Sequence, residues 1–158
     1  MSENIFPLPS SEQGDEVEFY RLATLLHQAA AQWRVRLDKR LRPWGMTQTT
    51  WRILWILRMA ERSYNQSELA ARLGVENPTL VKIIDRMEAK ALLKRTADSQ
   101  DRRQKRIEIT DEGMQLALEI EHQVVGIRHE ILAELSAEER QAGIAVLSKI
   151  VDKIAALP

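Results

Sequence analysis

Two short helices separated by a tight turn constrain the fold of this chain more than any other feature. The first helix begins after Asn65, which is followed three residues later by Glu68. This is the spacing of a capping box, in which each side chain accepts a hydrogen bond from the backbone N–H of the other residue. Leu73-Gly74 predicts the end of that helix, because glycine tolerates the left-handed conformation that follows many helices.

The second short helix follows after two further residues. Asn77 is a capping residue, and Pro78 suits the first helical position, where a backbone N–H would have no partner. The helix is expected to reach about Lys90, with an inward face made of Leu80, Val81, Ile84 and Met87. Two short helices joined through residues 74–76 predict a helix-turn-helix.

An alternating segment follows this helix pair. Residues 92–97 and 105–109 are expected to be strands, with Ile107 and Ile109 on one face of the second strand and Arg106 and Glu108 on the other. Four cations stand in the five positions from 102 to 106. We therefore expect a β-hairpin, or wing, whose cations project from it beside the helix pair.

Longer helical patterns flank this unit. Apolar residues recur every three to four positions from Glu16 to about Leu41, and Pro43 stops that helix. Thr47 can cap the next helix, which is expected to end near Glu61.

Two helices are expected after the wing. Thr110 should cap the first, which runs to about Leu135, and the capping box of Ser136 and Glu139 opens the last. The apolar stripe of the first consists of Leu116, Ile120, Val124, Ile127 and Ile131. The stripe of the last consists of Ile144, Leu147, Ile150, Val151 and Ile154.

The flanking stripes need a surface to cover them, and a symmetric partner is the economical solution. The alternative is a monomer in which these helices fold back on the winged unit. The predicted fold is mainly α with a small β-wing, a winged helix-turn-helix flanked by long N- and C-terminal dimerisation helices. The expected divisions are an N-terminal arm at residues 1–14, a dimerisation helix at 15–46, the winged helix-turn-helix domain at 47–110 and the C-terminal dimerisation helices at 111–158.

The formal net charge of zero conceals strong local bias. Residues 77–106 carry nine bases and four acids, whereas residues 111–139 carry one base and eight acids. Basic segments of this kind can meet a polyanion while acidic segments face elsewhere. The chain has no cysteine, which excludes disulfides and thiolate metal sites, and no apolar run long enough to span a membrane. We expect a cytoplasmic protein without a membrane partner.

The second helix of a helix-turn-helix enters the major groove of DNA with its N-terminal residues nearest the bases. Thr79 can hydrogen-bond a base or contact a thymine methyl, and Lys82 and Arg86 can reach guanine or phosphate. The alternative is that these are ordinary exposed helix residues. The residues expected to bind DNA from this helix are Pro78, Thr79, Lys82 and Arg86.

The wing supplies the second group of expected DNA contacts. An arginine placed in a narrow minor groove meets an enhanced negative potential. Asp101 lies two residues before Arg103, close enough to hold its guanidinium in one direction. A solvated, highly charged turn is the alternative. The expected wing contacts are Arg102, Arg103 and Lys105, with Asp101 as a brace.

Other chemistries have little support in the sequence. His122 and His129 lie two helical turns apart, roughly 10 Å, which is too far for one shared metal ion. No phosphate loop, nucleophile elbow or pair of carboxylates suggests catalysis, so we expect no enzyme, no catalytic residue, no metal and no cofactor. A winged-helix module for protein or RNA is an open alternative, although no aromatic platform accompanies the basic residues as RNA would require.

The run VENPTLVKIIDRMEAKALLKRTADSQDRRQKRIEITDEG, residues 75–113, resembles the MarR family of winged-helix regulators and is most similar to its SlyA branch. The wing signature of that family, Asp-x-Arg followed by a strand that ends in Leu-Thr, is present as residues 101–103 and as Ile109-Thr110. Residues 41–51 are also SlyA-like, so the similarity spans roughly residues 20–155. Ala91 departs from the pattern, because the family usually has glycine there; we expect a tighter or shifted helix end.

The resemblance implies a homodimer that binds a palindromic duplex and is released by small aromatic anions. The positions that match the family's pocket are Thr47 and Trp51, with Trp33 and Arg34 near it. Spacing adds Trp55, one turn after Trp51. Core packing is the alternative role of these tryptophans. Arg34 has the charge that a carboxylate ligand requires, and its alternative role is to pair with a nearby acid.

The protein is therefore predicted to be a homodimeric regulator of transcription that binds specific sequences of double-stranded DNA. It is expected to act as a repressor, and small aromatic or phenolic anions are expected to release it from DNA. The alternative is a SlyA-like activator that displaces a silencing protein.

Overall fold

The computed structural model describes residues 14–98 and 105–157. The chain divides into two compact units, the first ending at Gln48 and the second beginning at Thr49. Six α-helices and a three-stranded antiparallel sheet are present in the described residues, which confirms the predicted mainly helical fold with a small wing. None of the described helices has the length and hydropathy that crossing a membrane requires.

The first unit consists mainly of one long helix, α1 (Asp15–Leu41), and this confirms the expected N-terminal helix. A short 3-10 helix, η1 (Arg42–Trp44), continues from it, and Gly45 then adopts a left-handed conformation with φ of 63°. The carboxylate of Asp38 accepts a hydrogen bond from the backbone N–H of Gln48 at 2.6 Å. This bond gives a partner to the backbone N–H of Gln48, the first residue of the next helix. The cap by Thr47 at that helix stays a prediction.

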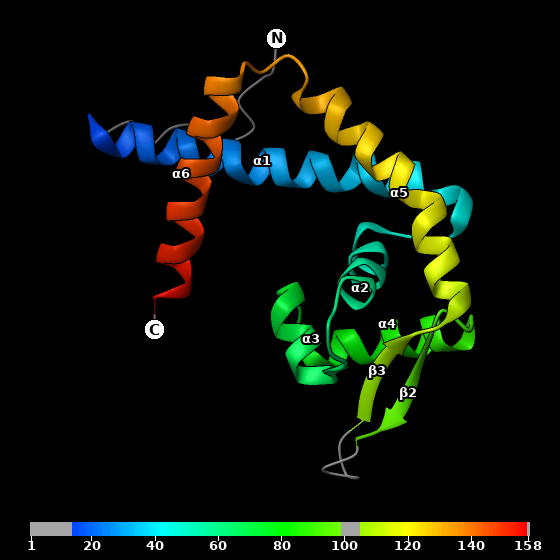
Figure 1. The fold of residues 1–158 in the computed structure, drawn as a ribbon. Helices are drawn as coiled ribbons and strands as arrows, with labels where there is room; N and C mark the ends of the chain where they lie inside the picture. Colours follow the sequence, from blue (N-terminus) through cyan, green and yellow to red (C-terminus); the bar gives the residue numbers. More distant parts are fainter. Residues whose placement is uncertain (1–13, 99–104, 158) are drawn as a thin grey trace. The chain divides into compact units, whose positions relative to one another are not determined.

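The helix-turn-helix is formed by α3 (Gln66–Leu73) and α4 (Asn77–Ala89), which pack against each other (Figure 1). Before them, α2 (Gln48–Arg58) ends three residues earlier than Glu61, the expected end. The capping box of α3 is confirmed: Asn65 and Glu68 each accept a hydrogen bond of 2.9 Å from the other's backbone N–H.

The predicted start of α4 was wrong by one residue. Glu76 occupies the cap position in extended conformation, with no cap hydrogen bond from its side chain, and Asn77 is already helical. Pro78 thus lies at the second helical position, which tolerates proline because its N–H would also have no partner within the helix.

Both helices of the pair end in the same backbone arrangement. After α3, the N–H groups of Gly74 and Val75 bond back to Ala71 and Ala70, and Gly74 is left-handed with φ of 68°. After α4, Ala91 and Leu92 bond back to Glu88 and Met87 in the same way. Ala91 has φ of 56° and is the only non-glycine residue with positive φ among residues 14–98 and 105–157. The helix end is therefore not shifted; alanine itself adopts the left-handed conformation that glycine favours.

The wing contains β2 (Leu93–Ala97) and β3 (Lys105–Ile109), as predicted to within one residue. A third strand, β1 (Tyr64–Asn65), pairs with the outer edge of β3 and gives the strand order β1-β3-β2. Tyr64 lies opposite Ile107, and Arg95 lies opposite Ile107 from the other side. A strand of two residues has no sequence period to detect, so β1 was not predicted.

Two helices follow the wing, α5 (Asp111–Leu132) and α6 (Ala137–Ala155). The caps by Thr110 and by Ser136 with Glu139 are confirmed, whereas α5 ends three residues before the expected Leu135. Within the single chain, Ile120, Val124 and Ile127 of the predicted stripe of α5 are buried, whereas Leu116 is half-buried and Ile131 is exposed. The buried residues of α5 are Gly113, Ala117, Ile120, Val124 and Ile127.

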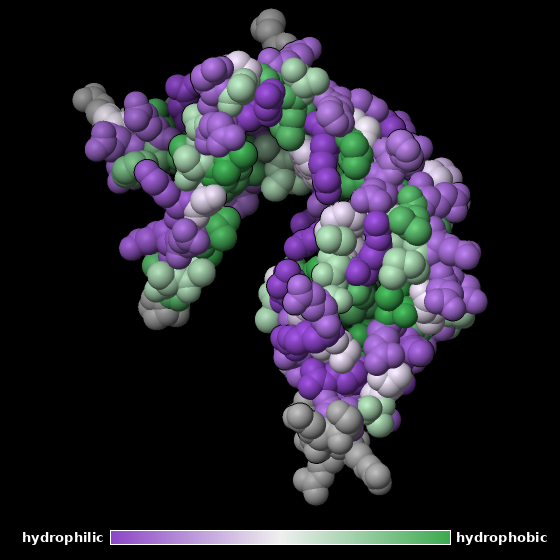
Figure 2. All heavy atoms as spheres, viewed as in Figure 1, coloured by the Kyte–Doolittle hydropathy of each residue, from purple (hydrophilic) through white to green (hydrophobic). Residues whose placement is uncertain are grey.

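Burial is distributed unevenly along the second unit. The apolar side chains without solvent exposure in its helix pair and sheet are Leu69, Leu80 and Ile84, with Leu93 and Ile107 nearly so. In contrast, α6 has no buried residue, and apolar side chains lie at its surface (Figure 2). The large exposed ones between residues 144 and 157 are Ile144, Val146, Leu147, Val151, Ile154 and Leu157.

Candidate nucleic-acid interface

The outward face of α4 carries all four residues that the sequence predicted for this helix. All four side chains are exposed, because the helical spacing places them on the side of α4 away from its buried residues: Pro78, Thr79, Lys82 and Arg86. The buried residues on the opposite face are Leu80, Ile84 and Met87. Burial of that face fixes how α4 is rotated about its axis and therefore which side chains face a ligand.

The second half of α4 is tied to the wing by Arg95 of β2. Its guanidinium contacts Glu88 at 2.5 Å and Asp85 at 2.6 Å, and its backbone N–H donates to Glu88 at 2.9 Å. Partial burial opposes the charged form, but the bonds to both carboxylates prevail and raise the pKa of Arg95. These contacts hold β2 against α4 and were not predicted from the sequence.

Lys105 is the one predicted wing contact within the described part of the chain. It is exposed at the start of β3 and lines a hollow of about 420 Å³ together with Asn65, Gln66 and Ser67. The last two lie in the first turn of α3, where backbone N–H groups point out of the helix and favour a negative charge. Gln66 and Ser67 were not predicted as part of the interface, although the capping box had already located this turn.

The remaining wing residues, Asp101, Arg102 and Arg103, lie outside the described residues. Their expected roles as brace and as DNA contacts stay predictions.

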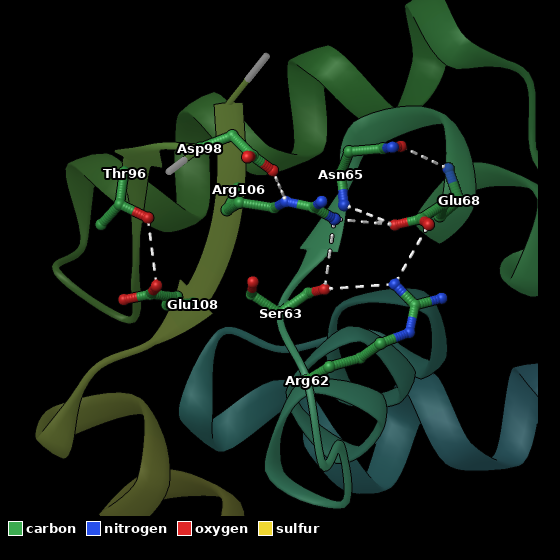
Figure 3. A network of polar contacts seen from close by, with 8 residues as sticks. All are labelled: Arg62, Ser63, Asn65, Glu68, Thr96, Asp98, Arg106 and Glu108. Carbon is green, nitrogen blue, oxygen red and sulfur yellow. Dashed lines mark hydrogen bonds and ion pairs between the residues drawn. The ribbon is translucent and has the colours of Figure 1, made fainter. Parts of the chain in front are cut away.

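Arg106 corrects the expectation that all four cations of the wing project from it. Its side chain is only 26% exposed, and its Nε donates to Asp98, whose side chain is 5% exposed (Figure 3). Its Nη1 lies 3.3 Å from the Oε2 of Glu68. The alternation along β3 correctly predicted that Arg106 and Ile107 lie on different faces of the strand. Only the fold brings two carboxylates to the face of Arg106.

Glu68 is the centre of a wider polar network. Besides capping α3, it accepts from Arg62 at 3.0 Å and contacts Arg106 (Figure 3). The bond from the backbone of Asn65 is the largest cause that lowers the pKa of Glu68, while burial acts in the opposite direction and both arginines lower the pKa further. The Glu68 carboxylate is thus held in its charged form.

The two tryptophans of α2 pack against each other, with ring centroids 5.6 Å apart. Trp51 is 3% exposed and Trp55 is half-buried. The guanidinium of Arg58 lies over the Trp55 ring and also bonds Glu121 of α5 at 2.8 Å. This arrangement contributes to the core, and the predicted ligand contact of both rings stays a prediction.

The other residues that the resemblance implied for a ligand belong to the first unit. Trp33 is half-buried, whereas Arg34 and Thr47 are exposed. Among residues 14–98 and 105–157, no group of three or more His, Cys, Asp or Glu side chains is placed to hold a metal ion.

Known proteins share this arrangement. The model of the MarR family matches residues 46–105, which include α3, α4, β2 and the first residue of β3. The crystal structure of transcriptional regulator PA3341 is 34% identical, with 86% of this chain and 99% of that chain covered and a TM-score of 0.79. This chain belongs to the MarR family.

As a member of this family, the chain is a winged-helix, DNA-binding transcriptional regulator and not an enzyme. A mutant of MarR from E. coli is 25% identical, with 82% of this chain and 96% of that chain covered and a TM-score of 0.68. The S. aureus MepR–DNA complex is 23% identical, with 83% and 96% covered and a TM-score of 0.78, and it shows the same fold.

Proposed function

We propose that this MarR-family chain is a homodimeric repressor that binds a palindromic operator and is released by small aromatic anions. The observation that carries the DNA-binding part is the exposed face of α4, on which Thr79, Lys82 and Arg86 stand above a fully buried Leu80 and Ile84. A helix held in this way can present donors to base edges in the major groove without reorientation. The solved MepR–DNA complex supports a duplex as the ligand.

The proposed interface has two parts that read DNA differently. Lys82 and Arg86 contact bases, while Lys105 and the first turn of α3 contact phosphate around the hollow that they share. Arg102 and Arg103 complete the wing, with Asp101 as the brace of Arg103, as the sequence predicts. The protein would act in the cytoplasm, where its DNA lies.

The dimer part of the proposal is supported by α6. Its apolar residues are exposed in the single chain, and each aliphatic side chain that becomes fully buried contributes about 1.5–3 kcal/mol. We propose that residues 15–46 and 111–158 dimerise around the DNA-binding domain, residues 47–110, and that residues 1–14 form an arm. Two copies would then place two α4 helices on successive half-sites.

Selection of bound duplexes from a random pool tests the DNA-binding proposal. We expect inverted repeats whose half-site centres are roughly 10 bp apart, one turn of the duplex. Lys82→Ala and Arg86→Ala should relax the base preference within each half-site. Lys149→Ala, which removes an exposed cation of α6, should leave it unchanged. Recovery of single half-sites at full affinity would contradict the dimeric mode.

The wing is tested by Arg103→Ala, which should weaken operator binding by about 1–3 kcal/mol. Asp101→Ala should also weaken binding, although it removes a negative charge. Tighter binding by this second variant at constant salt would show that Asp101 does not brace Arg103.

The effector part of the proposal rests on the resemblance and on the paired rings of Trp51 and Trp55. An aromatic carboxylate should quench tryptophan fluorescence saturably and lower DNA affinity, and DNA should lower carboxylate affinity by the same factor. Arg34→Ala should weaken the carboxylate without changing DNA affinity in its absence. If no aromatic acid up to millimolar concentration has either effect, the tryptophans serve the core alone.

The second candidate function is activation by displacement of a silencing protein, as in the SlyA branch. Its support is the similarity of residues 75–113 and 41–51 to that branch. Transcription from a target promoter, with and without a silencing protein, distinguishes it from repression.

A further inference from the structure

We propose that Arg106 is a positioning residue for DNA binding: it locks the wing to the N-terminus of α3 and does not itself contact DNA. The inference rests on the proposed DNA-binding function and goes beyond it, because it assigns one cation of the basic wing to an internal role.

Both sides of the hairpin and the start of α3 meet at Arg106 (Figure 3). The residue belongs to β3, its Nε donates to Asp98 directly after β2, and its Nη1 donates to Glu68 in the first turn of α3 at 3.3 Å. A longer contact of 3.5 Å reaches the backbone carbonyl of Ser63, which precedes β1. One guanidinium thus joins both strands of the hairpin to the cap of α3.

The charge balance around Arg106 supports the internal role. Asp98 is the only buried charged residue among those described, and a buried carboxylate is unfavourable unless it is paired. Arg106 pairs with Asp98 through its Nε and with Glu68 through its Nη1. A lysine has a single ammonium group and cannot span both carboxylates in this way. A guanidinium that two carboxylates neutralise offers little attraction to phosphate.

The contact also explains how two parts of the interface keep a fixed spacing. Lys105, the neighbour of Arg106, is exposed and faces the hollow with Gln66 and Ser67 of α3. Backbone pairing of β1 with β3 and the contacts of Arg95 also hold the wing to the helix pair. Because Arg106 ties β3 to Glu68 in that same turn, it fixes the spacing between Lys105 and the first turn of α3 more closely than backbone pairing does. Loss of the tie would leave the wing attached but this spacing less fixed.

The test compares Arg106→Gln with its matched neighbour Lys105→Gln, using an operator duplex at several salt concentrations. A side chain that contacts phosphate contributes about one unit to the slope of log affinity against log salt. Lys105→Gln should therefore lower the slope by about one. Arg106→Gln should reduce affinity about tenfold at each salt concentration with the slope unchanged, since it misplaces contacts without removing one. Arg106→Lys should behave like Arg106→Gln, although it keeps the charge.

Asp98→Asn provides the sharpest discrimination. If Arg106 is a positioning residue, removal of its partner weakens DNA binding, even though the protein becomes more positive. If Arg106 is a DNA contact that Asp98 restrains, the same change tightens binding. Thermal unfolding of each variant checks that it is folded, and Asp98→Asn distinguishes the two roles if Arg106→Gln does not fold.

A lower salt slope for Arg106→Gln, retained affinity for Arg106→Lys, or tighter binding by Asp98→Asn would each overturn the proposal. These outcomes differ from failure of the DNA-binding function, in which the unmodified protein would bind no duplex with salt-dependent affinity.

Discussion

The helix pair with its wing and the C-terminal helix α6 use similar apolar residues in opposite ways. The first region covers its own: Leu69, Leu80 and Ile84 have no exposed surface. In α6, which the structure describes completely, no residue is buried, and Ile154 is 61% exposed. The winged region therefore has a core within one chain, whereas α6 has an apolar stripe that one chain does not cover. Stability should respond to mutation locally in the first region and through association in the second.

The largest effect is expected at Gly113, where α5 begins beside the wing. A Cβ at this position would lie 2.0 Å from the backbone carbonyl oxygen of Leu92, and a backbone atom cannot rotate away. Gly113→Ala should lower the free energy of unfolding by about 4 kcal/mol or prevent folding. In the same helix, a Cβ at Gly126 meets no atom within 4 Å, so Gly126→Ala should stabilise by about 0.5–1 kcal/mol. Urea unfolding of both variants measures the difference in the free energy of unfolding. Equal values for the two variants would mean that the backbone at Leu92 moves away from the new Cβ without cost.

A pair of identical substitutions tests the comparison itself. Ile84→Ala should cost about 2–5 kcal/mol at any protein concentration, because the fully buried side chain leaves a cavity in its own chain. Ile154→Ala should have little effect in dilute protein and should instead raise the dissociation constant of the proposed dimer. Unfolding at several concentrations, together with analytical ultracentrifugation, separates the two. The contrast fails if Ile154→Ala destabilises equally at every concentration.

A stabilising change is expected at Ala91, the left-handed residue after α4. Glycine adopts this conformation without the steric penalty that a Cβ brings, although it loses more backbone entropy on folding. Ala91→Gly should therefore raise the free energy of unfolding by about 0.5–1 kcal/mol. A decrease would show that the flexibility of glycine in the unfolded chain outweighs the relief of strain.

The smallest effect concerns the acid side of the stability profile. The folded-state pKa of Glu68 is below 4.5, so its contribution is complete above about pH 4.5 and is lost as the pH falls through the lowered value. Between pH 5 and pH 3, Glu68→Gln should therefore lose less stability than the unmodified protein. Thermal unfolding across this range provides the measurement. Parallel profiles would mean that Glu68 has the same pKa in the folded and unfolded chains.

The secondary structure of the winged region and of the two helices after it could be predicted closely, because its signals are local. The capping boxes at Asn65–Glu68 and Ser136–Glu139 and the cap at Thr110 each depend on side chains within three residues of one another. Such bonds depend on local spacing and not on contacts between distant segments. The predictions failed where the local signal was weak, at the start of α4, where Asn77 entered the helix, and at the two-residue strand β1.

The candidate interface could be predicted only in part, for a related reason. Helical spacing alone placed Thr79, Lys82 and Arg86 on the face opposite Ile84, and the structure keeps them there. The inward turn of Arg106 had no signal in the sequence, since three of the four residues before it are also cations.

By itself, the sequence determined which helices form, where they begin to within a residue or so, and which of their faces are apolar, because these properties depend on neighbours a few residues apart. The tertiary structure decided which charges remain available to a ligand. Arg106 and Glu68 are 38 residues apart, and Arg58 and Glu121 are 63 residues apart. An ion pair of this kind exists only once packing has brought its two elements together, so no periodicity or cap can reveal it.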